Sequence, residues 1–321
     1  MTFPHGDSDF GDLLRVVARD SGLAVALVEK DYWVTHTLWG LHEVGLDVWF
    51  KGGTSLSKGF RLIERFSEDL DVKIERGTLA SVPTIANWKS TNKGQVSERQ
   101  GFFAALEDAI VIPDVRVELD RAQLDRHARW ATYLVYYPGQ FMDELGSAFR
   151  RIVQLEVGSA RVTPFLLRPL SSFVHGWLEQ AGKAGDYKDN LPRAVRSVHP
   201  LVTLLEKLDA IRRRYDRRGA EASFIRHYED AARIIQVEEK LPPLEDGLAQ
   251  LIHDMVTEKQ IEGIPQEDDA AFALGGGDRR SELENAYRAI APMFWGKRVS
   301  LEASCDIIRG WLRRRHRDLP G

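Results

Sequence analysis

Two aspartates one residue apart mark the part of the sequence with the clearest potential for chemistry. Asp69 and Asp71 lie in the stretch 69–74, where charged and apolar residues alternate as in a half-buried strand. On a strand their carboxylates project from the same face and could hold one hard cation or a pair. Mg²⁺, or Mn²⁺, suits such oxygen ligands and keeps room for phosphate. Taken alone, a D-x-D pattern is more often a solvated strand face.

A metal site of this kind needs a third carboxylate from a neighbouring strand. In the stretch 151–157 (RIVQLEV), Glu156 shares one strand face with Ile152 and Gln154 and stands among apolar neighbours. Burying a charge there is costly unless it binds a metal or a partner. Glu118, in the stretch 114–119, is the rival, and we favour Glu156.

A pair of glycines lies just before the aspartates, between a predicted strand and a predicted helix. Gly52 and Gly53 follow the apolar run 46–50 and precede residues 54–65, which have helical spacing. Backbone N–H groups of such a turn bind polyphosphate, and the hydroxyls of Thr54 and Ser55 would add donors. The segment is no Walker A loop, because Ser57 replaces the required glycine. The alternative is a tight turn that needs positive φ.

The remaining pattern predicts an α/β first half and a helical second half. Residues 10–44 have the spacing of two helices broken near Gly22, and 131–137 is a further predicted strand. Past Pro169 the apolar period is mostly helical, so we place a domain boundary near residue 165, giving domains 1–165 and 166–321. The acidic and glycine-rich stretch 265–278 is predicted to be a flexible loop between helices.

Composition excludes several classes of protein. The chain has 321 residues, 43% hydrophobic and 29% charged, as in soluble globular proteins, and no apolar run approaches the ~20 residues of a membrane span. With 44 basic and 48 acidic residues the net charge is -4, which excludes a globally basic nucleic-acid coat. The single cysteine, Cys305, cannot form an internal disulfide, and the first 20 residues lack the apolar core of a secretory signal. We therefore expect a cytoplasmic protein with no membrane partner.

Local basic patches remain candidates for nucleic-acid binding. Residues 207–218 and 309–318 are rich in arginine, and Trp311 in the second patch could stack on a base. A solvated helix face or a surface for an acidic partner protein explains each patch equally well.

Six stretches match one known family in order along the chain. Together they resemble the AbiEii/AbiGii nucleotidyltransferase toxins, the enzymatic halves of type IV toxin–antitoxin and phage abortive-infection systems. GGTSLSK and RFSEDLD are the most specific parts, and the matches span about two-thirds of the chain. The stretches are VEKDYWVTHTL (28–38), FKGGTSLSK (50–58), RFSEDLDV (65–72), VQLEVGSARVTP (153–164), LLEKLDAIRRR (204–214) and RHYEDAARII (226–235).

The resemblance implies a fold and a set of site residues. The fold would be α/β, with a polymerase-β-like nucleotidyltransferase core, a mixed sheet with flanking helices, followed by an α-helical C-terminal domain. Asp69, Asp71 and Glu156 would bind magnesium, and the family's essential lysine and late aspartate correspond to Lys207 and Asp230. The phosphates of the NTP would be held by Gly52, Gly53, Thr54, Ser55, Lys58 and Arg226.

The two helical residues also have simpler interpretations. Lys207 could pair with Glu206 or extend to solvent, and Arg226 and Asp230, four apart on a helix, could form a surface ion pair. Given the resemblance, we expect Asp230 to orient Lys207 or Arg226 at the phosphates, or to act as a base.

The function that the resemblance implies is transfer of a nucleotide from an NTP to RNA. The tRNA acceptor end is the first expectation, with arrest of translation as the result and a cognate antitoxin as the partner. Two alternatives stay open: transfer to a protein or small-molecule hydroxyl, and a non-catalytic NTP-binding module.

Overall fold

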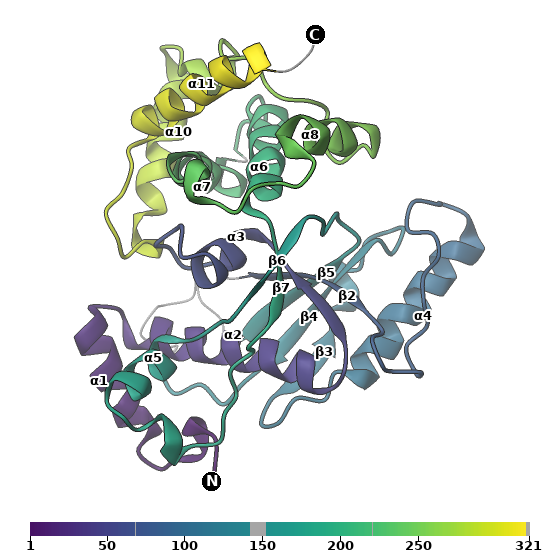
Figure 1. Cartoon of the computed structure of the whole chain (residues 1–321), viewed down its shortest axis with the longest axis vertical. Helices are drawn as coiled ribbons and strands as arrows, with labels where there is room; N and C mark the ends of the chain where they lie inside the picture. The colour runs from purple at the N-terminus through teal and green to yellow at the C-terminus, as the bar shows by residue number, and fades with distance from the viewer. Residues whose placement is uncertain (68, 142–151, 220, 319–321) are drawn as a thin grey trace. The chain divides into compact units, whose positions relative to one another are not determined.

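The chain forms two compact units, which a computed structural model describes over residues 1–67, 69–141, 152–219 and 221–318 (Figure 1). The first unit comprises residues 1–59 and 67–197, and the second comprises residues 60–66 and 198–321. The short segment 60–66 is therefore part of the second unit, although both of its neighbours in sequence belong to the first. The predicted boundary near residue 165 falls inside the first unit.

A mixed seven-stranded sheet forms the centre of the first unit, with the order β3-β4-β5-β2-β1-β7-β6. β2 pairs with β5 in parallel and with β1 in antiparallel orientation, whereas β4 runs antiparallel to both of its neighbours. The strands are β1 (Asp47–Phe50), β2 (Asp69–Glu75), β3 (Arg116–Leu119), β4 (Trp130–Tyr136), β5 (Ile152–Gly158), β6 (Phe165–Arg168) and β7 (Val195–Val198).

Alternation along β2 gives the central sheet one apolar and one polar face. Leu70, Val72 and Ile74 are buried, whereas Asp69 and Asp71 are half-buried on the opposite face. Helix α2 packs along β1 and β5, and α4 packs against β3. The helices of this unit are α1 (Phe10–Ser21), α2 (Val25–Glu43), the short α3 (Gly52–Thr54) with the helical turn η2 (Ser55–Gly59), α4 (Lys93–Ala109) and α5 (Phe173–Gln180).

The second unit is helical. Its centre is α7, which packs against α6 and α11 and buries Tyr228, Ala231 and Ile234. Segment 60–66 is held here by backbone hydrogen bonds from Phe66 N to Met293 O and from Trp295 N to Glu64 O. The helices are α6 (Pro200–Arg214), α7 (Arg226–Gln236), α8 (Gly247–Thr257), α9 (Ala270–Ala273), α10 (Asp278–Ala289) and α11 (Leu301–Asp318).

The predicted fold class is confirmed: a mixed sheet with flanking helices is followed by helices. Several details differ. The helix predicted over 54–65 ends at Gly59, the strands β6 and β7 were not predicted, and the loop predicted over 265–278 contains α9. Residue 151 of the predicted strand 151–157 lies outside the described residues. Among the helices described, none has the length and apolar content needed to cross a membrane.

Candidate active site

A glycine turn and an acidic strand meet in the first unit. Gly52 has φ +73°, and a Cβ built on it would lie 2.7 Å from Asp71 Cγ, closer than any real contact. Glycine is needed at this position both for the backbone conformation and for the close approach. The first residue of α3 therefore lies directly against the carboxylate of Asp71.

Strand pairing brings a third carboxylate to Asp71. Glu156 on β5 is the register partner of Asp71 on β2, while Gln154 is the partner of Asp69. Neighbouring strands are about 4.8 Å apart, so the three carboxylates occupy adjacent positions on one half-buried face. Glu118 lies on β3, with β4 and β5 between it and β2, and it forms an ion pair with Arg116. The register thus places Glu156, and not Glu118, beside the D-x-D strand.

The donor set fits the magnesium that the family resemblance implies. Asp69, Asp71 and Glu156 offer only oxygen ligands, and Mg²⁺ in phosphate-handling sites takes one or two carboxylates and completes its shell with water and phosphate. Within the described residues, no three Asp, Glu, His or Cys side chains converge as a ready-made metal-ligand set. The ligand roles of these three acids stay predictions.

The two hydroxyls predicted to bind phosphate, those of Thr54 and Ser55, differ in what they contact. Thr54 Oγ1 donates to the backbone carbonyl of Asp69 at 2.6 Å, which ties the start of α3 to the start of β2. Ser57 Oγ donates to Thr54 O at 3.1 Å. Ser55 Oγ is buried and has no hydrogen-bond partner among the described residues. Of the two hydroxyls predicted to bind phosphate, only that of Ser55 still has its proton to give.

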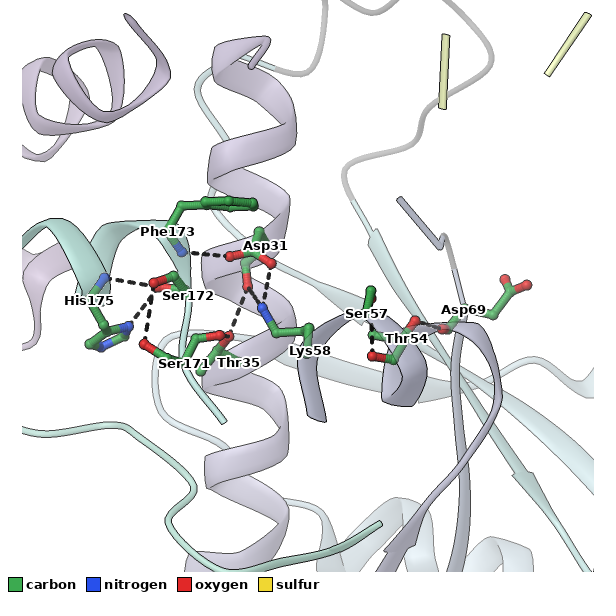
Figure 2. A network of polar contacts seen from close by, with 10 residues as sticks. All are labelled: Asp31, Thr35, Thr54, Ser57, Lys58, Asp69, Ser171, Ser172, Phe173 and His175. Atoms are coloured by element: carbon green, nitrogen blue, oxygen red, sulfur yellow. Dashed lines mark hydrogen bonds and ion pairs between the residues drawn. The ribbon is translucent and has the colours of Figure 1, made fainter. Parts of the chain in front are cut away.

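Lys58, also predicted to bind phosphate, is held inside the first unit by an acidic residue of α2. Its ammonium forms an ion pair with the Asp31 carboxylate and donates to Asp31 O at 3.3 Å. Figure 2 shows Lys58 reaching Asp31 on one side of the turn, while Thr54 contacts the backbone of Asp69 on the other. No chemical role for Asp31 follows from the sequence alone.

The second unit contains the other predicted site residues. Asp230, on α7, is fully buried and accepts hydrogen bonds from Arg65 Nε at 2.8 Å, Arg65 Nη2 at 2.7 Å and Lys207 Nζ at 2.7 Å. Burial alone would raise the pKa of Asp230, but Arg65 and Lys207 outweigh it and hold the pKa well below its ordinary value. The alternative of a surface pair with Arg226 is wrong, because Asp230 faces Arg65 and Lys207 in the interior. Asp230 contacts Lys207, as the expected orienting role requires, and that role stays a prediction.

Lys207 bridges Asp230 and a histidine. Its Nζ lies 3.3 Å from His227 Nδ1, so the ammonium donates to that nitrogen and the imidazole proton is on Nε2. Burial lowers the pKa of Lys207, and Asp230 opposes that shift. Burial and the charge of Lys207 hold the pKa of His227 well below its usual value, so the imidazole is neutral. Arg226, half-buried, begins α7.

Sequence reasoning missed three residues of these networks: Asp31, Arg65 and His227. All three occur inside quoted stretches, VEKDYWVTHTL, RFSEDLDV and RHYEDAARII, but nothing in their spacing indicates a partner. Asp31 lies on α2, a helix buried along nearly its whole length, where buried charge is itself a signal.

The arginine-rich C-terminal patch is largely neutralised by acids of its own unit. Trp311 is fully buried and its Nε1 donates to Glu238 at 2.8 Å, so the prediction that it stacks on a base is wrong. Arg315 pairs with Glu238, and Arg313 pairs with Glu267 of the acidic stretch. In the other patch, Arg212, Arg213 and Arg218 pair with nearby acids.

One comparison with known proteins assigns a family. A family model described as nucleotidyl transferase AbiEii toxin, Type IV TA system, matches residues 39–300. No curated protein matches. Among solved structures, the chain is similar to MenT4, a nucleotidyltransferase toxin from Mycobacterium tuberculosis H37Rv, with 17% identity, coverage of 95% of this chain and 96% of that chain, and a TM-score of 0.39. The family match, which includes the stretch 265–278, is the finding that assigns the family.

Proposed function

Because the chain belongs to the AbiEii family of nucleotidyltransferase toxins from type IV toxin–antitoxin systems, we propose that it transfers a nucleoside monophosphate from an NTP to RNA. The proposed acceptor is the 3′ end of tRNA, and the proposed consequence is a block of translation in the cytoplasm, with a role in phage defence. The family implies an antitoxin partner.

One observation supports this proposal most: the contact of the Gly52 turn with the carboxylate of Asp71, which is in register with Glu156. Transfer from an NTP needs donors for the phosphates beside acids for a cation, and here both occur within one short stretch of chain. Ser55, with its buried hydroxyl lacking a partner among the described residues, is the donor of the turn best suited to a phosphate oxygen.

The reaction forms one bond and breaks another at the α-phosphorus. The 3′ oxygen of the acceptor attacks in line, the bond to the oxygen bridging the α- and β-phosphates breaks, and pyrophosphate leaves while the hydroxyl proton passes to water. Magnesium held by Asp69, Asp71 and Glu156 would neutralise phosphate charge and lower the pKa of the attacking hydroxyl.

Lys207 is proposed to neutralise the charge of the phosphates, together with Arg226. Asp230 then serves to orient Lys207. As a general base it is unsuitable, because its pKa is held far below neutral and its carboxylate accepts three charge-assisted hydrogen bonds.

The test is to incubate the protein with Mg²⁺, each α-labelled NTP in turn, and total tRNA, and to locate the label on a denaturing gel. Label on tRNA from one NTP supports the proposal and gives the base preference. Label on protein or a small molecule moves the reaction to a different acceptor, and NTP binding without pyrophosphate release makes the chain a binding module.

Variants of the acids distinguish the proposed metal ligands from an acid on the surface. We expect Asp69→Asn and Asp71→Asn to reduce transfer by roughly 10²-fold or more, because metal charge stabilisation is worth several kcal/mol. Glu156→Gln should fall in the same range, whereas Glu118→Gln, a strand acid paired with Arg116, should stay within about twofold of wild type. Retained transfer in folded Asp69→Asn and Asp71→Asn variants would remove the metal assignment.

A further inference from the structure

The ammonium of Lys58 is enclosed and has a fixed acidic partner. Its side chain is 7% exposed, that of Asp31 is 11% exposed, and the two form an ion pair (Figure 2). Lys58 Nζ also donates to the backbone carbonyl of Asp31 at 3.3 Å. Because the Lys58 ammonium makes two contacts to one buried residue, it can hold the backbone around Lys58 in place.

Asp31 is itself held by hydrogen bonds from α5 and from its own helix, α2. Its Oδ2 accepts from the backbone N–H of Phe173, the first residue of α5, at 2.9 Å. One turn further along α2, Thr35 Oγ1 donates to Asp31 O at 3.0 Å. The carboxylate thus has one oxygen on α5 and the other on Lys58, so its position is set by α2 and α5 together.

From Lys58 a short run of contacts leads to the acidic strand. Lys58 lies on the turn η2, where Ser57 Oγ bonds to Thr54 O, and Thr54 Oγ1 bonds to Asp69 O. In Figure 2 the Asp69 side chain points away from this contact, so the anchoring uses its backbone and leaves the carboxylate directed elsewhere. At the start of the segment 52–59, which comprises α3 and η2, Gly52 lies against the carboxylate of Asp71.

We propose that Asp31 is a positioning residue for nucleotidyl transfer, acting through Lys58 to fix the 52–59 turn against β2. This inference rests on the proposed function. Lys58 then contributes to phosphate binding indirectly: its ammonium anchors the turn whose backbone and Ser55 hydroxyl meet the NTP. Asp31 touches neither substrate nor metal in this role.

Three variants test the pair, and one serves as a matched control. Asp31→Asn keeps the shape and removes the charge, Lys58→Met removes the ammonium, and the double variant removes both. Glu29→Gln is the control, because Glu29 is a fully buried acid of the same helix that accepts from the backbone N–H groups of Gln140 and Phe141, which are not part of the turn.

We expect each single variant to raise the KM for the NTP about tenfold, with a smaller change in kcat, and the double variant to be no worse than the poorer single one. The amides of residues 53–59 should exchange hydrogen faster in all three. Glu29→Gln should lower the melting temperature without moving KM or exchange in the turn. Should Asp31→Asn fold poorly, the double variant, which leaves no unpaired buried charge, carries the test.

The outcomes are distinct. Tighter NTP binding in Asp31→Asn with weaker binding in Lys58→Met would make Lys58 a direct phosphate ligand and overturn the inference. Unchanged KM and unchanged exchange in Asp31→Asn would also overturn it. Wild type that transfers no label refutes the proposed function instead, and the exchange of residues 53–59 then still shows whether Asp31 fixes the turn.

Discussion

Thr54 and Ser55, neighbours on the glycine turn, are expected to respond oppositely to loss of their hydroxyls. Thr54→Val leaves the Asp69 carbonyl without its 2.6 Å donor, which should cost about 1–3 kcal/mol of unfolding free energy. Ser55→Ala removes a buried hydroxyl that has no partner among the described residues, so stability should stay the same or rise by up to about 1 kcal/mol, while NTP affinity falls. Chemical denaturation and NTP titration of both variants measure this. A destabilised Ser55→Ala with normal affinity would contradict a phosphate role for Ser55.

Removal of the Asp230 charge should be far more costly than loss of a surface acid. Asp230→Asn leaves Arg65 and Lys207 buried without their anion, which is expected to cost about 3–5 kcal/mol. Glu262→Gln, which affects a partly exposed pair with Arg212, should cost about 0–1 kcal/mol. Denaturant unfolding of the two variants compares them directly. Similar losses in both would show that the buried network contributes little.

At the scale of residues, types and spacing made the acids and the glycine turn candidates, and the family resemblance added Lys207. It could not supply the partners that hold them. Asp31 and Lys58 are separated by 27 residues and Arg65 and Asp230 by 165, and no periodicity relates positions so far apart. Whether Thr54 or Ser55 already donates a hydrogen bond depends on the backbone of β2, and a single sequence does not show this.

Buried histidines make the first unit sensitive to acid. His36 is buried on this helix, its Nε2–H donates to Pro113 O at 2.9 Å, and its Nδ1 accepts from Asn190 at 2.9 Å. Burial lowers the pKa of His36 to about 4, against 6.5 in the unfolded chain. His5 and His175 shift in the same direction, also through burial. Between about pH 4 and pH 6.5, the folded state therefore binds fewer protons than the unfolded state.

Stability should accordingly fall as the pH drops below about 6.5, with most of the loss complete near pH 4. The slope from His36 alone is about 1.4 kcal/mol per pH unit at most. Unfolding free energies between pH 5 and 8 measure it, and His36→Gln, which keeps a donor toward Pro113, should flatten the curve. An unchanged slope in His36→Gln would assign the effect to other groups.

Elements were predicted well where one face is apolar and the pattern is local. β2 and the break at Gly22, which has φ +71°, follow from alternation and from glycine. The helix predicted over 54–65 failed past Gly59 because Arg61 adopts φ +54° and the segment 60–66 packs in the second unit. β6 has no fully buried residue and β7 is buried at three of its four positions, so neither strand shows a clear apolar alternation.

At the scale of the whole molecule, the second unit includes segment 60–66, which comes just before the acidic strand β2 in the sequence. A fragment of residues 1–197 lacks Asp230 and Met293, which hold Arg65 and Phe66. We expect trypsin to cut this fragment after Arg65, while the full chain, where Arg65 is 1% exposed, resists. Mass spectrometry of the early products reads the result. A fragment protected at Arg65 would mean that segment 60–66 needs no partners from the second unit.

The placement of segment 60–66 also has a consequence for the order of events during translation. Arg65 leaves the ribosome 165 residues before Asp230 does. At about 5–20 residues per second, this interval lasts roughly 8–33 s. Throughout it, Arg65 lacks its buried counter-ion, and Lys207, which is made 23 residues before Asp230, lacks the same partner over the last part of the interval. A nascent chain thus contains its acidic strand and glycine turn long before Arg65 and Lys207 gain their shared anion.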